Sequence, residues 1–266
     1  MGEFWESALA FKGVAVGAWL ALLLLAERLR PSAPYPNGRP WAIARPARNL
    51  AFLVISALVS LAIVVPVSRL AAGLELGIRP GWATGGAGLL FDLLLLDFLI
   101  YWWHQANHRV PFLWRFHEVH HLDRFLDASS AVRFHFGEVI LSALARAGVI
   151  LLFTIPLSSV LAFEALVLAA AAFHHSDLKL PAGLERWLSK IVVTPSIHWV
   201  HHHRIRRDTD SNYATILSLW DPLFGTRSGT RRTPEMEIGV EGREEQDLPG
   251  LLMRPFVASR PTPEPT

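Results

Sequence analysis

The sequence of 266 residues contains no cysteine. The chain therefore forms no disulfide, no thiolate zinc site and no iron–sulfur cluster held by its own residues. Charge is also scarce, because only 18% of the residues are charged and the formal net charge is +2. So small a net charge does not indicate a nucleic-acid partner. If the protein carries out redox chemistry, its electrons must come from another molecule.

Long uncharged runs are abundant instead, and hydrophobic residues make up 52% of the chain. Residues 9–26, 50–67 and 83–103 are each close to the roughly 20 helical residues that cross a bilayer core. The first run follows no positively charged stretch and precedes no small-residue cleavage site, so we interpret it as a retained membrane helix. The sequence therefore predicts an integral membrane protein.

Residues 139–173 form a longer apolar run, with Pro156 near its middle. We expect a tight helical hairpin, with one helix at about 139–155 and its return at 157–173. The alternative is one tilted span followed by a surface helix, which would place His121 and His198 on opposite sides of the membrane. Five arginines between residues 28 and 48 predict a cytoplasmic loop. The expected fold is all-α, an integral-membrane bundle of about four to five spans with a cytoplasmic, histidine-rich helical cap.

We divide the chain into three segments: N-terminal spans with the arginine-rich loop at 1–82, a histidine-bearing catalytic domain at 83–226, and a soluble C-terminal tail at 227–266. Leu184, Trp187, Leu188 and Ile191 recur at helical spacing, which predicts a helix lying at the membrane interface. The last residues, 261–266, are expected to be disordered.

Twelve histidines are present, and eight form three clusters with helical spacing. The clusters are His104 and His108, then His117, His120 and His121, then His198, His201 and His202. Residues three or four apart share one face of a helix, so each triplet can supply two ligands to one metal and one to its neighbour. Eight imidazoles are too many for one ion, and the pattern therefore predicts a two-metal centre.

Further residues are expected to complete this centre. The additional ligands are predicted to be His135 and His175, and the supporting residues Asp97, His174 and Asp177. Asp97 precedes His104 by seven residues on one helical stripe, so we expect it to accept a ring N–H from a ligand histidine. His203 directly follows the third triplet and is expected beside the metals or at the surface.

Nitrogen ligands suit iron, copper, nickel or zinc rather than magnesium or calcium. A site beside lipid favours oxidation of apolar substrates, and zinc cannot oxidise an unactivated C–H bond. The order of the histidine clusters resembles that of the fatty acid hydroxylase / sterol desaturase superfamily. Four further stretches resemble motifs of the same superfamily: Arg133-x-His135-x-x-Glu138, Phe173-His174-His175-Ser176, Asn212-Tyr213 and the stretch from Trp220 to Thr226. The resemblance covers about residues 91–226.

This resemblance implies a non-haem di-iron centre that uses O2 and two external electrons per turnover to hydroxylate a lipid or another apolar membrane substrate. It implies an external electron donor, such as a ferredoxin or cytochrome b5, and a location in a bacterial inner membrane or its equivalent. It places the metals on the three histidine clusters, with His175 and His135 as further ligands.

Three other functions remain open from the sequence. A desaturase would share the scaffold and differ only in the fate of the substrate. A metal transporter or metal-binding membrane protein would place its ligands near the bilayer midplane. A zinc hydrolase would need only three protein ligands and a general base.

Overall fold

The structure, a computed structural model, describes residues 2–35, 38, 43–74 and 77–257. All regular elements in these ranges are helices, and the remaining pairing consists of isolated bridges such as His203 with Ile238. The expected all-α fold is thus confirmed. The predicted disorder of residues 261–266 lies outside the described residues.

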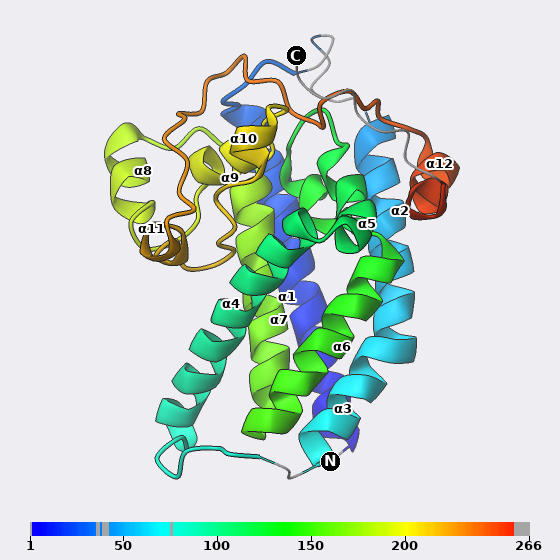
Figure 1. Cartoon of the computed structure of the whole chain (residues 1–266), viewed down its shortest axis with the longest axis vertical. Coiled ribbons are helices and arrows are strands. Elements are labelled where there is room, and N and C mark those ends of the chain that lie inside the picture. The colour runs from blue at the N-terminus through cyan, green and yellow to red at the C-terminus, as the bar shows by residue number, and fades with distance from the viewer. Residues whose placement is uncertain (1, 36–37, 39–42, 75–76, 258–266) are drawn as a thin grey trace.

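Long helices build the lower part of the molecule (Figure 1). They are α1 (Gly2–Leu29), α2 (Ala44–Val59), continued by η2 (Ser60–Val64) and α3 (Val65–Gly73), then α4 (Gly85–Arg109), α6 (Phe136–Phe153) and α7 (Leu157–His175). Four helical stretches are long and apolar enough to cross a membrane: Ala44–Gly73, Gly85–Arg109, Phe136–Phe153 and Leu157–His175. The first apolar run forms α1, which packs along α7 and is fastened there by a hydrogen bond from Trp19 Nε1 to the carbonyl oxygen of Ala169.

Short helices form a cap over one end of this bundle (Figure 1). They are α5 (Pro111–His121), η3 (Ala128–Val132), α8 (Ala182–Leu188), α9 (Pro195–His201), α10 (Arg206–Thr209), α11 (Trp220–Phe224), α12 (Leu248–Met253) and η4 (Arg254–Phe256). The expected interfacial helix corresponds to α8, and its Leu184 and Trp187 are exposed.

The predicted hairpin is present, and Pro156 marks its turn as expected. Thr154 ends α6 in the left-handed region with φ of 48°, and Pro156 precedes α7. The two charges inside this apolar run pair with each other across the hairpin, Arg146 Nη2 to Glu164 Oε1 at 3.2 Å. Both helices can therefore lie in lipid without an isolated charge.

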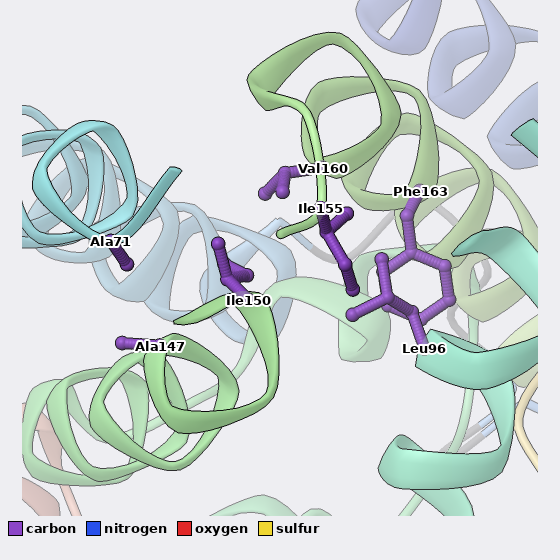
Figure 2. Packing of buried hydrophobic residues seen from close by; sticks show 7 residues of the cluster. All are labelled: Ala71, Leu96, Ala147, Ile150, Ile155, Val160 and Phe163. Carbon is purple, nitrogen blue, oxygen red and sulfur yellow. The ribbon is translucent and has the colours of Figure 1, made fainter. Parts of the chain in front are cut away.

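The apolar core of the bundle surrounds this turn (Figure 2). Side chains from four helices and the turn meet there: Ala71, Leu96, Ala147, Ile150, Ile155, Val160 and Phe163. The same end holds a buried ion pair, in which Asp92 accepts two hydrogen bonds from Arg79, at 2.8 and 3.1 Å, and one from Ser159, at 2.7 Å. This pair ties the connection between α3 and α4 to the start of α7, at the end of the bundle opposite the cap.

The C-terminal segment, as far as residue 257, packs onto the cap. Leu251 of α12 is buried against Phe52 and Val119, and Ile238 joins the cluster around Trp199. The boundary at residues 226 and 227 stays a prediction, since these contacts join the two segments rather than separate them.

Candidate metal centre

Histidine side chains converge under the cap as two adjacent groups. Group one contains five residues, His104, His108, His117, His121 and His201, and group two contains four, His120, His175, His198 and His202. Within each group, one ring nitrogen of every residue lies within 4.8 Å of those of the others. Such an arrangement can hold one metal ion per group.

Helical geometry explains how the triplets divide. On α5, His117 and His121 face group one, while His120 faces group two. The stretch formed by α9 and its C-cap inverts this pattern, since His201 faces group one and both His198 and His202 face group two. Each triplet thus contributes two rings to one group and one to the other, which is the division that the spacing predicts.

Two of the long helices complete the groups from below. The last two turns of α4 carry His104 and His108 of group one, and His175 of group two is the last residue of α7. Because α4 and α7 both end at the cap, an even number of bundle helices separates His121 from His175, as expected.

The Nε2 atoms of group two lie as far apart as nitrogens that bind the same metal ion. The Nε2 atom of His175 lies 3.0 Å from that of His120 and 3.0 Å from that of His198, and the Nε2 atoms of His198 and His202 lie 3.1 Å apart. Imidazole bonds zinc at about 2.0–2.1 Å, which places two ligand nitrogens about 2.9 Å apart at a right angle. The spacing therefore fits a first-row metal ion.

Backbone carbonyl groups orient four of the rings. The Nδ1 atom of His104 donates to the carbonyl oxygen of Tyr213 at 2.8 Å, and that of His201 donates to Ser211 at 2.6 Å. In group two the Nδ1 atoms of His120 and His175 donate to the carbonyl oxygens of Arg133, at 3.2 Å, and Ala171, at 2.8 Å. A proton held on Nδ1 leaves the Nε2 lone pair directed inward, which is the tautomer that a metal requires.

Group one contains buried ring nitrogens that have no hydrogen-bond partner in the described part of the chain. They are both nitrogens of His108, both of His121, and the Nε2 atoms of His117 and His201. Each buried, unsatisfied nitrogen costs about 1–3 kcal/mol. A metal ion would satisfy several of them at once, so the donor set fits a metal.

Burial keeps five rings of the cap neutral. Loss of hydration, reinforced by neighbouring imidazoles, holds the pKa of His120, His121, His198, His201 and His202 well below the usual value of 6.5. Neutral imidazole is the form that binds metal, so little proton release is needed at neutral pH.

Three histidines lie outside both groups. His135 is the exception to the expected ligand set, because its Nδ1 accepts the amide of Gly137 and its Nε2 donates to the carbonyl oxygen of Leu252 at 3.0 Å. His203 donates from Nδ1 to Asp208 Oδ2 at 2.8 Å and joins neither group. The third triplet is therefore His198, His201 and His202. His174 packs against His198, with ring centroids 4.0 Å apart, and so lies beside group two.

The two expected supporting carboxylates bind other partners. Asp97 accepts hydrogen bonds from Trp220 Nε1 at 2.8 Å and from the amide of Leu217. Seven residues span about 10 Å along a helix, too far for its carboxylate to reach the ring of His104. Asp177 accepts from the amide of Ala33 and from Arg232, and so fastens the loop after α1 to the end of α7.

The loop around residues 211–214 supplies two of the orienting carbonyl groups, a role that its residue types do not predict. Asp221 accepts the amides of Tyr213 and Ala214, at 2.8 and 3.1 Å, and Asn212 adopts a φ of 52°. These contacts turn the carbonyl groups of Ser211 and Tyr213 toward the histidines. The motifs were visible in the sequence, but a carbonyl direction leaves no trace in residue types.

Glu138 is a second functional residue that the sequence pattern does not reveal. It lies in the first turn of α6, is buried, and accepts the Nδ1 proton of His117 on Oε1 at 2.8 Å. In the sequence it belongs to the Arg-x-His-x-x-Glu element, where the metal role was assigned to His135 instead.

Comparison with known proteins agrees with this geometry. The fatty acid hydroxylase family model matches residues 89–226, just over half of the chain, and this range contains both histidine groups. The chain belongs to the fatty acid hydroxylase family. No solved structure matches it.

Several curated proteins are similar to this family member. Ornithine lipid hydroxylase OlsE from Rhizobium tropici is 27% identical over 168 residues, covering 63% of this chain and 50% of that protein. Alkylglycerol monooxygenase from Danio rerio is 34% identical over 131 residues, covering 49% and 28%. Very-long-chain aldehyde decarbonylase GL1-5 from Oryza sativa subsp. indica is 30% identical over 185 residues, covering 63% and 28%. The chain spans half or less of the length of each of these relatives.

Proposed function

We propose that the protein is a membrane-bound, O2-dependent di-iron monooxygenase that hydroxylates a lipid or another apolar membrane substrate. The observation that carries this proposal is the pair of buried histidine groups at the end of a bundle of apolar helices. Membership of the fatty acid hydroxylase family supports it, as do the relatives named for the hydroxylation of lipids. The proposed ligands are the five residues of group one and the four of group two, without His135.

Iron is the metal that best fits both the ligands and the reaction. Imidazole binds iron and zinc alike, but oxidation of a C–H bond needs a metal that changes its oxidation state. When bound, the iron pair would supply oxygen activation: one oxygen atom enters a C–H bond and the other leaves as water, with two electrons and two protons consumed. The chain contains no cysteine for an iron–sulfur cluster, so we propose an external donor such as a ferredoxin or cytochrome b5.

The residues of the chain serve three purposes in this reaction. The carbonyl groups of Ser211, Tyr213 and Arg133 hold ring protons away from the metal positions. The cap buries the rings and excludes bulk water, which protects a reactive site. The helices beneath the site can bring an apolar substrate to it from the bilayer.

The membrane orientation follows from the arginine-rich loop. The connection between α1 and α2 leaves α1 and enters α2 at the cap end of the bundle, which is also the end that holds the histidines (Figure 1). Positively charged loops remain in the cytoplasm. We therefore propose that the metal centre lies on the cytoplasmic side of a bacterial inner membrane or an equivalent membrane.

Metal transport is disfavoured by where the ligands lie. Transporters hold ions near the bilayer midplane, whereas these rings occupy the final turns of α4 and α7 and two cap helices. Desaturation would use the same centre, and the product therefore has to distinguish it from hydroxylation.

The test is turnover by the purified, iron-loaded protein with a chemical reductant, ¹⁸O2 and a membrane lipid extract. Hydroxylation predicts a lipid product that carries one ¹⁸O atom; desaturation predicts a product lighter by two hydrogens and without ¹⁸O. His120→Ala should abolish the product because it removes a group-two ligand. His203→Gln is the matched control, since His203 lies outside both groups, and it should retain turnover. Full activity of His120→Ala, or no reductant-dependent product from the unaltered protein, would refute the proposal.

A further inference from the structure

The two histidine groups differ in the charge of the acceptors behind them. In group one, His117 Nδ1 lies 2.8 Å from Glu138 Oε1, and His108 Nδ1 lies 3.5 Å from Asp210 Oδ1. In group two, the acceptors that orient rings are the carbonyl groups of Arg133 and Ala171. Among the described residues, the ion pairs that involve histidine are these two and that of His203, so none involves a ring of group two.

Glu138 is fixed in place against a ring of group one. It is the third residue of α6, where the positive end of the helix dipole stabilises a negative charge. Its Oε1 atom also accepts from Asn107 Nδ2 at 3.3 Å, which fixes the carboxylate between α4 and α5. The other oxygen, Oε2, is buried and has no partner in the described part of the chain. The carboxylate is therefore directed at one ring of group one.

Asp210 is held against group one by an arginine. Arg206 Nε donates to Asp210 Oδ2 at 2.6 Å, and Arg206 Nη2 donates to the carbonyl oxygen of His108 at 3.2 Å. The guanidinium of Arg206 also stacks over Trp114 at 5.1 Å. Arg206 and Asp210 thus hold His108 from its backbone and its ring. The facing atoms, His108 Nδ1 and Asp210 Oδ1, are both buried and have no closer partner among the described residues.

A carboxylate behind a ligand imidazole makes that ring a stronger donor than a carbonyl group does, because the hydrogen bond is charge-assisted. We propose that Glu138, through its hydrogen bond to His117, and Asp210, through its negative charge 3.5 Å from His108, are positioning residues that act on the metal of group one alone, so that the two metal sites differ in affinity and electronic character beyond their difference in ligand number, five against four. The inference rests on the two-metal centre of the proposed function. It adds that these two carboxylates increase the asymmetry between the sites.

Metal titration of the full chain in detergent tests this without any turnover. The metal-free protein is titrated with ferrous iron against a competing chelator, and ⁵⁷Fe-loaded samples are examined by Mössbauer spectroscopy. The unaltered protein should bind two equivalents with two distinct signals, and His201→Ala identifies the signal of group one. Glu138→Gln keeps an acceptor oxygen but removes the charge. This variant should lower the affinity for one of the two iron equivalents by about 10–100-fold and alter only the group-one Mössbauer signal.

Two further variants make the test decisive. Asp210→Asn should alter the same signal less strongly, because Asp210 lies farther from its ring than Glu138 does. Since Asp210 is partly exposed, this variant should fold even if Glu138→Gln does not, and it then tests the inference alone. Glu118→Gln is the matched control, since Glu118 is also buried beside His117 but binds Arg254. It should leave both signals unchanged.

The outcomes separate the two proposals. If Glu138→Gln and Asp210→Asn leave both signals unchanged, or alter both equally, the carboxylate asymmetry is refuted while the two-metal centre stands. If the unaltered protein binds fewer than two equivalents, the two-metal centre falls and this inference falls with it.

Discussion

At the scale of single residues, the partners of each ring nitrogen decide which histidines can meet a metal ion. The spacing of His117, His120 and His121 predicts how a helix distributes three rings between two sites, and the structure shows this distribution. His135 lies in an equally suggestive motif, yet its two ring nitrogens bind Gly137 and Leu252. Spacing reports which residues share a helix face, but not which partner reaches a ring from a distant segment.

The buried, neutral imidazoles predict a pH dependence of the metal-free protein. In the folded state their pKa values lie well below 6.5, as burial lowers them, whereas the unfolded chain takes up protons near the ordinary value. The unfolded state therefore binds more protons at low pH. The contribution of these rings to the free energy of unfolding is fully present above about pH 6.5. It is lost as the pH falls below that value, by up to about 1.4 kcal/mol per ring and pH unit.

Chemical denaturation of the metal-free protein between about pH 5 and about pH 8 measures this effect. His203→Gln is the control, because His203 is hydrogen-bonded to Asp208 rather than placed in either group, and its slope should match that of the unaltered protein. A denaturation midpoint independent of pH over this range would contradict neutral burial of the rings.

At the scale of elements, apolar runs and Pro156 predict the spans and the hairpin well. The bilayer requirement for about 20 apolar residues is a strong constraint that composition alone reveals. The cap was less predictable. Its loop at residues 211–226 is shaped by Asp221 and Asn212, most of whose partners are backbone groups. Backbone N–H and carbonyl groups occur at nearly every residue and place no demand on residue type, so no sequence pattern signals these bonds.

The ion pair between Arg79 and Asp92 predicts a coupled effect on stability. Asp92→Leu leaves the partly buried guanidinium of Arg79 with carbonyl acceptors only, and the loss should approach the lower end of the about 3–5 kcal/mol that breaking a fully buried pair costs. The double variant with Arg79→Leu should recover much of that loss, because no uncompensated charge remains. Thermal unfolding in detergent measures both variants.

Because this pair lies at the end of the bundle opposite the histidines, the folded fraction of each variant should bind metal like the unaltered protein. A double variant less stable than Asp92→Leu alone would show that the pair does not hold these helices together in the way described.

At the scale of the whole molecule, the account requires that the cap and the connection between α3 and α4 lie on opposite sides of the membrane. The lack of native cysteine makes this directly measurable. A cysteine introduced at exposed Glu237, in the cap, should react with an impermeant thiol reagent only from the cytoplasmic side. A cysteine at Gly81, before α4, should react only from the other side. Labelling of both from one side would contradict the predicted topology.

The most direct test of the central claim is an anomalous difference map at the iron absorption edge from crystals of the iron-loaded protein. We expect two separate peaks, one among the five histidines of group one and one among the four of group two. A single peak, or peaks away from both groups, would contradict a two-metal centre held by these histidines.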